Sequence, residues 1–518
     1  MNISPIAGAH MAAAHVVFID DGINGSIFDI PLCYDLEFAS DTNTFVPRAV
    51  HDVKELTHGT TCAAILKKYC HLFRCSSLKV LNNHNGKGDI QALCAALLWC
   101  VNHSVDIVTI CAGSVNFADA DVLQPLISML SKRSIVVCAQ SNIGYMTYPA
   151  SFSNVIGVQE AELPDEQKLK LCDRPFNGIE VSARGNHTLQ CKTLERISTG
   201  TGNSFAAPYV TACICSMLYE GYRFHPVQTL EALASYIQMP LFRHAPCFPD
   251  WIVNAFVIGD VSGLTEFFFF HVVMEVPLNQ YGILRNSASS TRCSEFDTIV
   301  LAFDDTMTRA EKQKMIRHVC SMEKHVAIVD SFSVLPPAGF QHKFWSSQKR
   351  LPHFPLPKQQ SLEAPFIIVY DHTSKTLLRT CAQLAQSFST DGYHACIATN
   401  VPAGTLQRFY YIQYETLQDD SFFRAMEETA QADVHICGVQ LLEGAFDKQT
   451  ASHMDKLADI AIYCSSTDGA TICWNSNLDE GRHQWQSSHH IPATSSTGCT
   501  EKNFISMVYK TILSTLDC

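Results

Sequence analysis

Residues 200–210, with the sequence GTGNSFAAPYV, place one serine between a glycine-rich turn and an apolar run. A helix that begins near Ser204 would leave its first N–H groups without intrahelical partners and direct the positive end of its dipole toward this hydroxyl. Pro208 is compatible with the first turn of such a helix, where its missing N–H costs nothing. This setting suits a nucleophile, although a serine that only caps a buried helix has the same local pattern. The decision depends on whether the chain also supplies a base, an acid and an oxyanion donor.

Upstream of this stretch, short β-type runs alternate with longer helical runs. We expect strands at 15–20, 76–81, 105–113 and 134–140, and helices at 58–69, 89–103, 121–133 and from Ser204 onward. This alternation is typical of a parallel sheet with helices on both faces, so the sequence predicts a three-layer α/β domain over residues 14–262. In such sheets, functional groups collect at the carboxyl ends of strands and at the helix starts that face them. Four polar side chains fall at such places: Asp20, His58, Asn142 and Ser204.

The second half of the chain contains another alternating series. The sequence predicts an α/β lobe over residues 263–345, a proline-rich linker over 346–365 and a further α/β lobe over 366–518. We expect these parts to form a second, Rossmann-like α/β region, in one or two lobes, that serves as a binding or assembly module. Strand-end carboxylates in this half are expected to be solvated caps rather than members of an acid/base pair; they are Asp304, Asp330 and Asp371.

The composition narrows the possible classes of protein. With 518 residues, of which 47% are hydrophobic and 17% charged, the chain should form several globular domains. Its net charge of −13 argues against nucleic acid or an anionic membrane as the main partner. The 22 cysteines are scattered without a CxxC pair, so we expect reduced thiols and neither a metal site nor a cofactor. We see no secretory signal and no apolar run of the roughly 20 residues that a membrane span needs, which predicts a cytoplasmic protein.

Asp20, His58 and Ser204 are the residue types that nucleophilic acyl transfer requires. A serine hydroxyl is a poor nucleophile until a neighbouring base removes its proton, and a carboxylate that orients a histidine improves that base. Asp20 ends an apolar strand, where a buried carboxylate is costly unless it is paired or hydrogen-bonded. A histidine at a helix start can supply that partner, so the chain order Asp, His, Ser predicts a catalytic triad.

Three segments resemble the signatures of the subtilisin-like serine proteases, or subtilases. The segments are Val16–Gly22, His58–Ala63 and Gly202–Val210, and they occur in the family's order. The resemblance covers roughly residues 14–262. It implies that Asp20 orients His58, that His58 is general base and then general acid, and that Ser204 is the nucleophile. It also implies that Asn142 is an oxyanion donor and that a substrate peptide pairs with the backbone of Cys111, Ala112 and Gly113.

Several positions depart from the family pattern. Asp21 replaces the usual Ser or Thr after the acid, and Asn203 replaces the usual Thr before the nucleophile. Only five residues separate Asn142 from Tyr148, a segment that is longer in many subtilases, so the specificity pocket cannot be predicted. Cys62 follows His58 by one helical turn, as in the thiol-sensitive branch of the family. We interpret it as a packed apolar thiol rather than a catalytic one.

The resemblance implies an intracellular serine endopeptidase that cleaves a peptide or precursor protein through an acyl-enzyme. A subtilase region followed by an α/β region, without a secretory signal or a folding propeptide, is similar to the proteases that remove leader peptides during bacterial natural-product maturation. The C-terminal region would then assemble with other maturation enzymes. Two alternatives stay open: a general intracellular protein-degrading subtilase, and a non-catalytic scaffold that only binds peptides.

Overall fold

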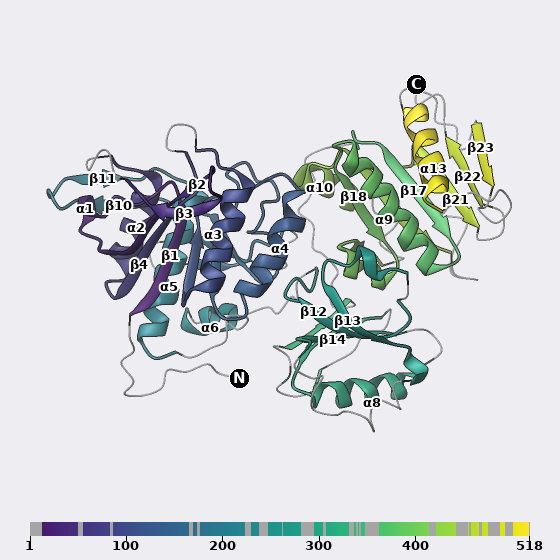
Figure 1. Cartoon of the computed structure of the whole chain (residues 1–518), viewed down its shortest axis with the longest axis horizontal. Helices are drawn as coiled ribbons and strands as arrows, with labels where there is room; N and C mark the ends of the chain where they lie inside the picture. The colour runs from purple at the N-terminus through teal and green to yellow at the C-terminus, as the bar shows by residue number, and fades with distance from the viewer. Residues whose placement is uncertain are drawn as a thin grey trace. The chain divides into compact units, whose positions relative to one another are not determined.

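The computed structural model describes most of the chain (Figure 1). The described residues are 13–49, 55–82, 86–164, 169–172, 177–222, 229–237, 247–261, 263–280, 295–303, 307–330, 336–337, 340, 343–347, 362–413, 421–441, 454, 457–465, 469–474, 487–492 and 501–516. The chain divides into two compact units, Met1–Pro246 and Cys247–Cys518, which are called the first and second unit below. Within the described residues, no helix has the length and apolar character needed to cross a membrane.

The first unit is built on one nine-stranded sheet with the order β3-β2-β4-β1-β5-β6-β7-β9-β8. All neighbouring strands are parallel except the two edge pairs, β2 with β3 and β8 with β9. The strands are β1 (Ala14–Asp20), β2 (Leu32–Ala39), β3 (Thr44–Pro47), β4 (Phe73–Lys79), β5 (Ile107–Ile110), β6 (Ile135–Ala139), β7 (Ile156–Glu160), β8 (Leu169–Leu171) and β9 (Val181–Ala183). A separate hairpin pairs β10 (Thr188–Gln190) with β11 (Arg196–Ser198).

Helices cover both faces of this sheet. One face packs against α2 (His58–Tyr69) and α5 (Asn203–Tyr219), and the other packs against α3 (Ile90–Asn102) and α4 (Asp119–Leu130). The described residues of the first unit also form two shorter helices, α1 (Gly25–Phe28) and α6 (Thr229–Tyr236). The three-layer parallel α/β architecture expected for this region is therefore confirmed.

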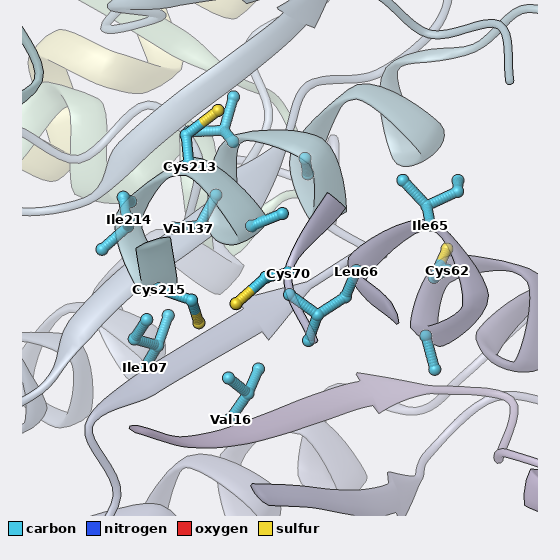
Figure 2. Packing of buried hydrophobic residues seen from close by; sticks show 14 of the residues in the cluster. Val16, Cys62, Ile65, Leu66, Cys70, Ile107, Val137, Cys213, Ile214 and Cys215 are labelled. Carbon is cyan, nitrogen blue, oxygen red and sulfur yellow. The ribbon is translucent and has the colours of Figure 1, made fainter. Parts of the chain in front are cut away.

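The alternation of side chains along β1 determines which helices its terminal carboxylate meets. Val16 and Phe18 belong to the core under α2 and α5, whereas Val17 and Ile19 belong to the core under α3 and α4. Figure 2 shows part of the first core, in which Val16 lies opposite side chains of both helices. Successive strand residues point to opposite faces of the sheet, so Asp20 points to the same face as Val16 and Phe18. It therefore ends the strand on the side of α2 and α5.

The expected elements of the first unit agree with the structure to within a few residues. β1, β4, β5 and β6 lie where strands were predicted, and α2 has the predicted bounds. The helix expected from Ser204 begins one residue earlier, because Asn203 already has helical geometry and Gly202 is the N-cap.

The second unit contains two sheets. The first has the order β13-β12-β14-β15-β16, and all its neighbouring strands are parallel. Its strands are β12 (Asn254–Ile258), β13 (His271–Val276), β14 (Thr298–Ala302), β15 (His325–Val329) and β16 (Phe344–Ser346). The associated helical elements are α8 (Arg309–Cys320), η2 (Thr265–Phe267) and η3 (Leu278–Gln280).

The second sheet of this unit has the order β19-β18-β20-β17-β21-β22-β23. Its first five strands are mutually parallel, and β22 and β23 extend it in antiparallel pairs. The strands are β17 (Phe366–Asp371), β18 (Ala395–Thr399), β19 (Tyr410–Tyr411), β20 (Val434–Gln440), β21 (Ile460–Ser465), β22 (Gly469–Trp474) and β23 (Ser487–Pro492). The helical elements are α9 (Ser374–Thr390), α10 (Ser421–Ala430), α13 (Glu501–Leu516) and η6 (Pro402–Gln407).

The second half differs from the sequence-based expectations in two respects. The predicted boundary at 262/263 lies beyond β12, which pairs with β13 and β14 and so belongs to the second unit. Asp330 and Asp371 are each only 3% exposed, so the expectation of solvated caps is wrong for both. Asp304 and most of the predicted linker, residues 348–361, lie outside the described residues. The Rossmann-like character of this half stays a prediction.

Candidate active site

The structure brings Asp20, His58 and Ser204 together at the carboxyl end of β1. His58 is the first residue of α2, and Ser204 is the second residue of α5. The His58 Nδ1 atom lies 2.8 and 3.0 Å from the two carboxylate oxygens of Asp20, and the His58 Nε2 atom lies 2.8 Å from the Ser204 hydroxyl. All three distances are within hydrogen-bonding range. The arrangement is a continuous chain from carboxylate to imidazole to hydroxyl.

These hydrogen bonds determine the tautomer of His58. The carboxylate of Asp20 can only accept, so the proton of the neutral imidazole lies on Nδ1. The Nε2 atom then carries the lone pair and accepts from the Ser204 hydroxyl. This is the tautomer that a general base needs in order to remove the hydroxyl proton.

Asp20 is 1% exposed, and its charge is compensated locally. Besides the imidazole, its Oδ1 atom accepts a 2.8 Å hydrogen bond from the backbone N–H of Asp21. Charge-assisted hydrogen bonds of this kind are what allow a carboxylate to remain in a buried position. The acid is therefore held by the turn that follows its own strand.

Asp21 supports the start of α2. Its two carboxylate oxygens accept from the backbone N–H groups of His58, at 3.0 Å, and of Gly59, at 2.7 Å. Burial and the neighbouring charge of Asp20 raise the pKa of Asp21, and these two backbone hydrogen bonds oppose the rise. The sequence identified this position only as a departure from the family pattern. The structure shows that its carboxylate fixes the backbone that carries the imidazole.

The pKa of His58 is raised above its usual value although burial alone would lower it. The opposing causes are the charge of Asp20, its hydrogen bond to the ring, and the charge of Asp21. Negative charge nearby stabilises the imidazolium form. The site therefore favours the protonated histidine that follows removal of a proton from Ser204.

Gly59 permits α2 to approach β1 this closely. A Cβ atom at this position would lie 2.7 Å from the carbonyl oxygen of Gly22 and 3.2 Å from the Cβ atom of Asp20. Gly22 itself has a φ of +99°, a conformation that favours glycine, in the turn between the strand and the helix. These two glycines let the imidazole reach the acid directly.

Asn142 lies beside the start of α5, as the sequence predicted from its place after a strand. Its Oδ1 atom accepts a 2.9 Å hydrogen bond from the backbone N–H of Asn203. Because the carbonyl end of the amide takes this hydrogen bond, the NH₂ end is the donor that remains. The same Oδ1 atom and the Ser204 hydroxyl both lie within 4 Å of a Cβ position built on Gly202, so the amide adjoins the nucleophile.

The Asn203 side chain holds this corner of the site in place. Its Oδ1 atom accepts from the backbone N–H of Glu160 at 2.6 Å, and its Nδ2 atom donates to the carbonyl oxygens of Gln140 and Ser141 at 3.2 and 2.9 Å. The helix start is thereby tied to β7 and to the residues just before Asn142. The sequence signalled Asn203 only as a substitution, and the structure gives it a positioning role.

The segment Cys111–Gly113 follows β5 and lies outside the paired sheet. The next residue, Ser114, forms an isolated antiparallel bridge with Tyr148. Ala112 is half-buried and Gly113 is exposed, whereas Cys111 is buried. Ala112 and Gly113 therefore reach the protein surface, whereas the Cys111 side chain is buried.

Two thiols adjoin the triad. The Cys62 Sγ atom lies 3.8 Å from the His58 Nδ1 atom and 3.4 Å from the carbonyl oxygen of Ser204. The Cys111 thiol is in hydrogen-bond contact with both Cys62 and the Asp20 carboxylate. Burial raises the pKa of Cys62 well above its usual value, so this thiol is protonated at neutral pH. That state agrees with a packed thiol and not with a nucleophilic thiolate.

His187 joins the two helices that carry the base and the nucleophile, a contact that no sequence pattern indicates. Its Nδ1 atom lies 3.0 Å from the Tyr69 hydroxyl in α2, and its Nε2 atom lies 3.2 Å from the carbonyl oxygen of Phe205 in α5. Burial lowers the pKa of His187 to about 4, so it is neutral at physiological pH. The Nε2–H group then donates to Phe205 while Nδ1 accepts from Tyr69. A histidine in a loop, far from both helices in the sequence, carries no recognisable signal for this contact.

A parallel α/β sheet with this arrangement at the carboxyl end of β1 defines a subtilisin-like domain. The model of the Subtilase family matches residues 13–235, and this part of the chain is a subtilase domain.

The relatives found by sequence cover only part of the chain. The minor extracellular protease Epr of Bacillus subtilis is 26% identical over 134 residues, which cover 25% of this chain and 20% of that protein. The major intracellular serine protease of the same organism is 27% identical over 145 residues, which cover 26% of this chain and 44% of that protein. The chain spans less than half the length of the curated relatives that it matches.

Among solved structures, one similar protein is the epidermin leader peptide processing serine protease EpiP from Staphylococcus aureus. It is 17% identical, with a TM-score of 0.33, and the match covers 43% of this chain and 69% of that chain.

Proposed function

We propose that the chain is a serine endopeptidase that acts through an acyl-enzyme. The observation that carries this proposal is the hydrogen-bonded chain from Asp20 through His58 to Ser204. In the first step the Ser204 Oγ atom attacks the scissile carbonyl carbon while its proton passes to the His58 Nε2 atom. The imidazolium is stabilised by the buried carboxylate of Asp20.

The negative charge that develops on the carbonyl oxygen needs preorganised donors. We assign this role to the Asn142 NH₂ group and the Ser204 backbone N–H, which is one of the amides in the first turn of α5 without an intrahelical acceptor. Collapse of the tetrahedral intermediate breaks the C–N bond, and the departing amine takes the proton from the His58 Nε2 atom. Water then attacks the acyl-enzyme, with His58 again as base, and releases the carboxylic acid and free Ser204.

The substrate is a peptide or precursor protein in extended conformation. The position of Ala112 and Gly113 at the protein surface after β5 supports pairing of a substrate strand with this segment, in which the main chain is bound and the side chains select the sequence. Removal of a leader peptide is the more specific proposal. It is supported by the subtilase domain followed by a separate α/β unit large enough to recognise a precursor or to assemble with other maturation enzymes.

We further propose a cytoplasmic protein whose second half is a Rossmann-like α/β region in two lobes. The cysteines in the described part of the chain carry free thiols, which favours a reducing compartment. The parallel strands of both sheets in the second unit support the Rossmann-like assignment.

The test of the serine mechanism is covalent labelling with a fluorophosphonate probe, followed by peptide mapping. The wild type should be labelled at Ser204, and Ser204→Ala should not be labelled. Ser216→Ala is a matched control, because Ser216 lies in the same helix but donates to the carbonyl oxygen of Ala212. Correctly folded wild type without label at Ser204 would favour the rival function, a non-catalytic peptide-binding scaffold.

A second experiment separates a selective protease from a general degrading one. Mass spectrometry would identify the products from a library of leader-bearing precursor peptides and from several unrelated unfolded proteins. Selective maturation predicts a single cut at the leader junction and intact unfolded proteins. Indiscriminate hydrolysis would refute selectivity and leave the serine mechanism standing.

A further inference from the structure

Cys70 and Cys215 join the two helices of the candidate active site at the ends remote from the triad. Cys70 directly follows α2, and Cys215 lies in the second half of α5. Their thiols are in hydrogen-bond contact, and Figure 2 shows the two sulfur atoms facing each other in the core. At 1.5 Å per residue, this contact lies about 16 to 18 Å along the helices from His58 and Ser204. Side chains therefore join α2 to α5 at both ends.

The two thiols of this pair differ in proton affinity. The hydrogen bond from Cys215, with further contacts to Leu72 and Ser216, lowers the pKa of Cys70 to about 6, although burial opposes the change. The same hydrogen bond and burial raise the pKa of Cys215 well above its usual value. Cys70 is therefore largely a thiolate at neutral pH, and Cys215 is the protonated thiol that donates to it. The thiolate is the form in which cysteine reacts as a nucleophile.

Cys70 is also the member of the pair that lies nearer to solvent. It is 5% exposed, compared with 1% for Cys215. Its neighbours along the chain, Tyr69, His71 and Leu72, are all exposed. A small oxidant such as hydrogen peroxide therefore reaches Cys70 before it reaches Cys215.

We propose that Cys70 and Cys215 form a reversible disulfide when the protein meets a peroxide, and that this bond clasps α2 to α5. The proposal concerns a modification site, and it does not depend on the serine endopeptidase function. Both cysteines carry free thiols in the structure, which is the reduced state of the pair. No sequence pattern indicates the pair, because its members lie in segments far apart in the chain.

The oxidation takes place in two steps. The Cys70 thiolate attacks one oxygen of hydrogen peroxide, the O–O bond breaks, and the hydroxide that leaves takes up a proton to become water. The Cys215 sulfur then attacks the resulting sulfenic acid, the S–O bond breaks, and the hydroxyl group leaves as water with the proton of the Cys215 thiol. The two sulfurs together lose two electrons, and one peroxide becomes two water molecules. A dithiol reductant reverses the reaction by thiol–disulfide exchange.

A bond at this place should hold the helices together without displacing the triad. A disulfide separates its sulfur atoms by about 2 Å, so two sulfurs in hydrogen-bond contact need to approach by only roughly 1 to 2 Å. The other end of α2 is held separately, since the Asp21 carboxylate accepts from the backbone N–H groups of His58 and Gly59. The bond also joins two distant segments and so restricts the unfolded chain. We therefore expect slower opening of both helices.

Peptide mapping tests the site without any measurement of proteolysis. Reduced full-length protein is treated with hydrogen peroxide, quenched in denaturant with N-ethylmaleimide, and digested without reductant for mass spectrometry. The peptides of Cys70 and Cys215 should appear joined, with the loss of two hydrogen atoms, and dithiothreitol should separate them. Cys33 is the internal control because it is exposed, and Cys70 should nevertheless be oxidised at least tenfold faster. Faster oxidation of Cys33, or a Cys70 peptide joined to any other segment, would overturn the proposal.

Two serine variants of α5 identify the partner of Cys70. Cys215→Ser should form no joined peptide, and dimedone should trap the sulfenic acid on Cys70. Cys213→Ser is the matched control, since Cys213 lies two positions away in the same helix, and it should form the joined peptide as the wild type does. A joined peptide that persists in Cys215→Ser would overturn the assignment. If that variant does not fold, Cys70→Ser decides: Cys215 should then stay reduced, and its oxidation at the wild-type rate would refute the proposed order.

Hydrogen exchange tests the clasp separately from the site. Complete oxidation of the pair should slow exchange in peptides of α2 and α5 at least tenfold, and dithiothreitol should restore the original rate. Peptides of β17 in the second unit are the control, and their exchange should not change. Unchanged exchange in α2 and α5 after complete formation of the disulfide would refute the clasp.

Discussion

Two buried aspartates show how similar positions in the fold acquire different chemistry. Asp20 ends β1 in the first unit, and Asp330 directly follows β15 in the second unit; each carboxylate faces the beginning of a helix. Asp20 meets His58, the first residue of α2. Asp330 meets Lys312 in the first turns of α8, with the ammonium nitrogen 3.0 and 3.1 Å from its two oxygens.

The identity of the partner decides what each pair can do. An ammonium group has three donors and no lone pair, so Lys312 neutralises Asp330 but cannot accept a proton. The imidazole of His58 has a second nitrogen, which carries the lone pair that Ser204 approaches. A strand-end carboxylate therefore becomes part of a proton-transfer chain only where the facing helix supplies a histidine. Lys312 and Asp330 are an ion pair that holds a helix to a sheet.

The largest expected effect is on catalysis in the first unit. Ser204→Ala and His58→Ala should each lower kcat by about a million-fold, and the double variant should lose little more, because the residues act as a unit. Asp330→Asn should leave kcat unchanged. Steady-state kinetics on a cleaved precursor peptide would measure all four variants. A large loss of kcat in Asp330→Asn would break the comparison, since the ion pair would then belong to the reaction.

The next effect is on stability in the second unit. Lys312→Met should cost about 3 to 5 kcal/mol, because it leaves the buried carboxylate of Asp330 without its charged partner. The double variant Lys312→Met with Asp330→Leu should recover most of that loss, since both buried charges are gone. Hydrogen exchange of peptides from β15, measured by mass spectrometry in the full chain, would report the change. Equal exchange in wild type and Lys312→Met would show that the ion pair contributes nothing.

The sequence predicted the first of these pairs but not the second. Asp20, His58 and Ser204 lie in motifs whose local patterns indicate a strand end and two helix starts. The alternation of side chains along β1 then places the acid on the face of the sheet that α2 and α5 cover. Lys312 and Asp330 have no such pattern. A lysine in an amphipathic helix and an aspartate after a strand are usually solvated, and only the packing of α8 on β15 reveals that they meet.

Other residues of the candidate site were not predicted, because their roles depend on contacts between segments that lie far apart in the sequence. His187 reaches α2 and α5 from a loop. Its partners are one tyrosine hydroxyl and one backbone carbonyl oxygen, and neither forms a recognisable motif with the histidine. The contact between the thiols of Cys62, in α2, and Cys111, which follows β5, likewise joins segments that lie far apart in the sequence. Propensity and periodicity predict elements and their buried faces, but they contain no information on which side chains become neighbours across a sheet.

Asn142 should affect the transition state more than substrate binding. Asn142→Ala should lower kcat by about 10²- to 10³-fold with little change in KM, because the NH₂ group meets charge that exists only during the reaction. Measurement of kcat and KM separately on one peptide would test this. A rise in KM with unchanged kcat would assign Asn142 to ground-state binding instead.

His187 should make the first unit sensitive to acid. Its folded pKa of about 4 lies below the usual value near 6.5, so below pH 6.5 the unfolded chain takes up a proton that the folded chain does not. The contribution of His187 to the free energy of unfolding is constant above pH 6.5. It declines by about 2 to 3 kcal/mol as the pH falls toward 4. His187→Gln, which cannot be protonated, should flatten this part of the stability profile. Urea unfolding followed by hydrogen exchange in α2 and α5 would test it, and parallel profiles would assign the acid sensitivity to other groups.

The smallest expected effect concerns the second carboxylate beside His58. Activity requires neutral His58, so kcat/KM should rise with pH through the raised pKa of this residue. Asp21→Asn removes a negative charge that stabilises the imidazolium, so the acidic limb of the profile should move to lower pH. The amide oxygen can still accept from one of the two backbone N–H groups at the start of α2. The pH dependence of kcat/KM for wild type and Asp21→Asn would measure the displacement. If the acidic limb stays where it is, Asp20 alone sets the proton affinity of His58, and Asp21 serves only the backbone of α2.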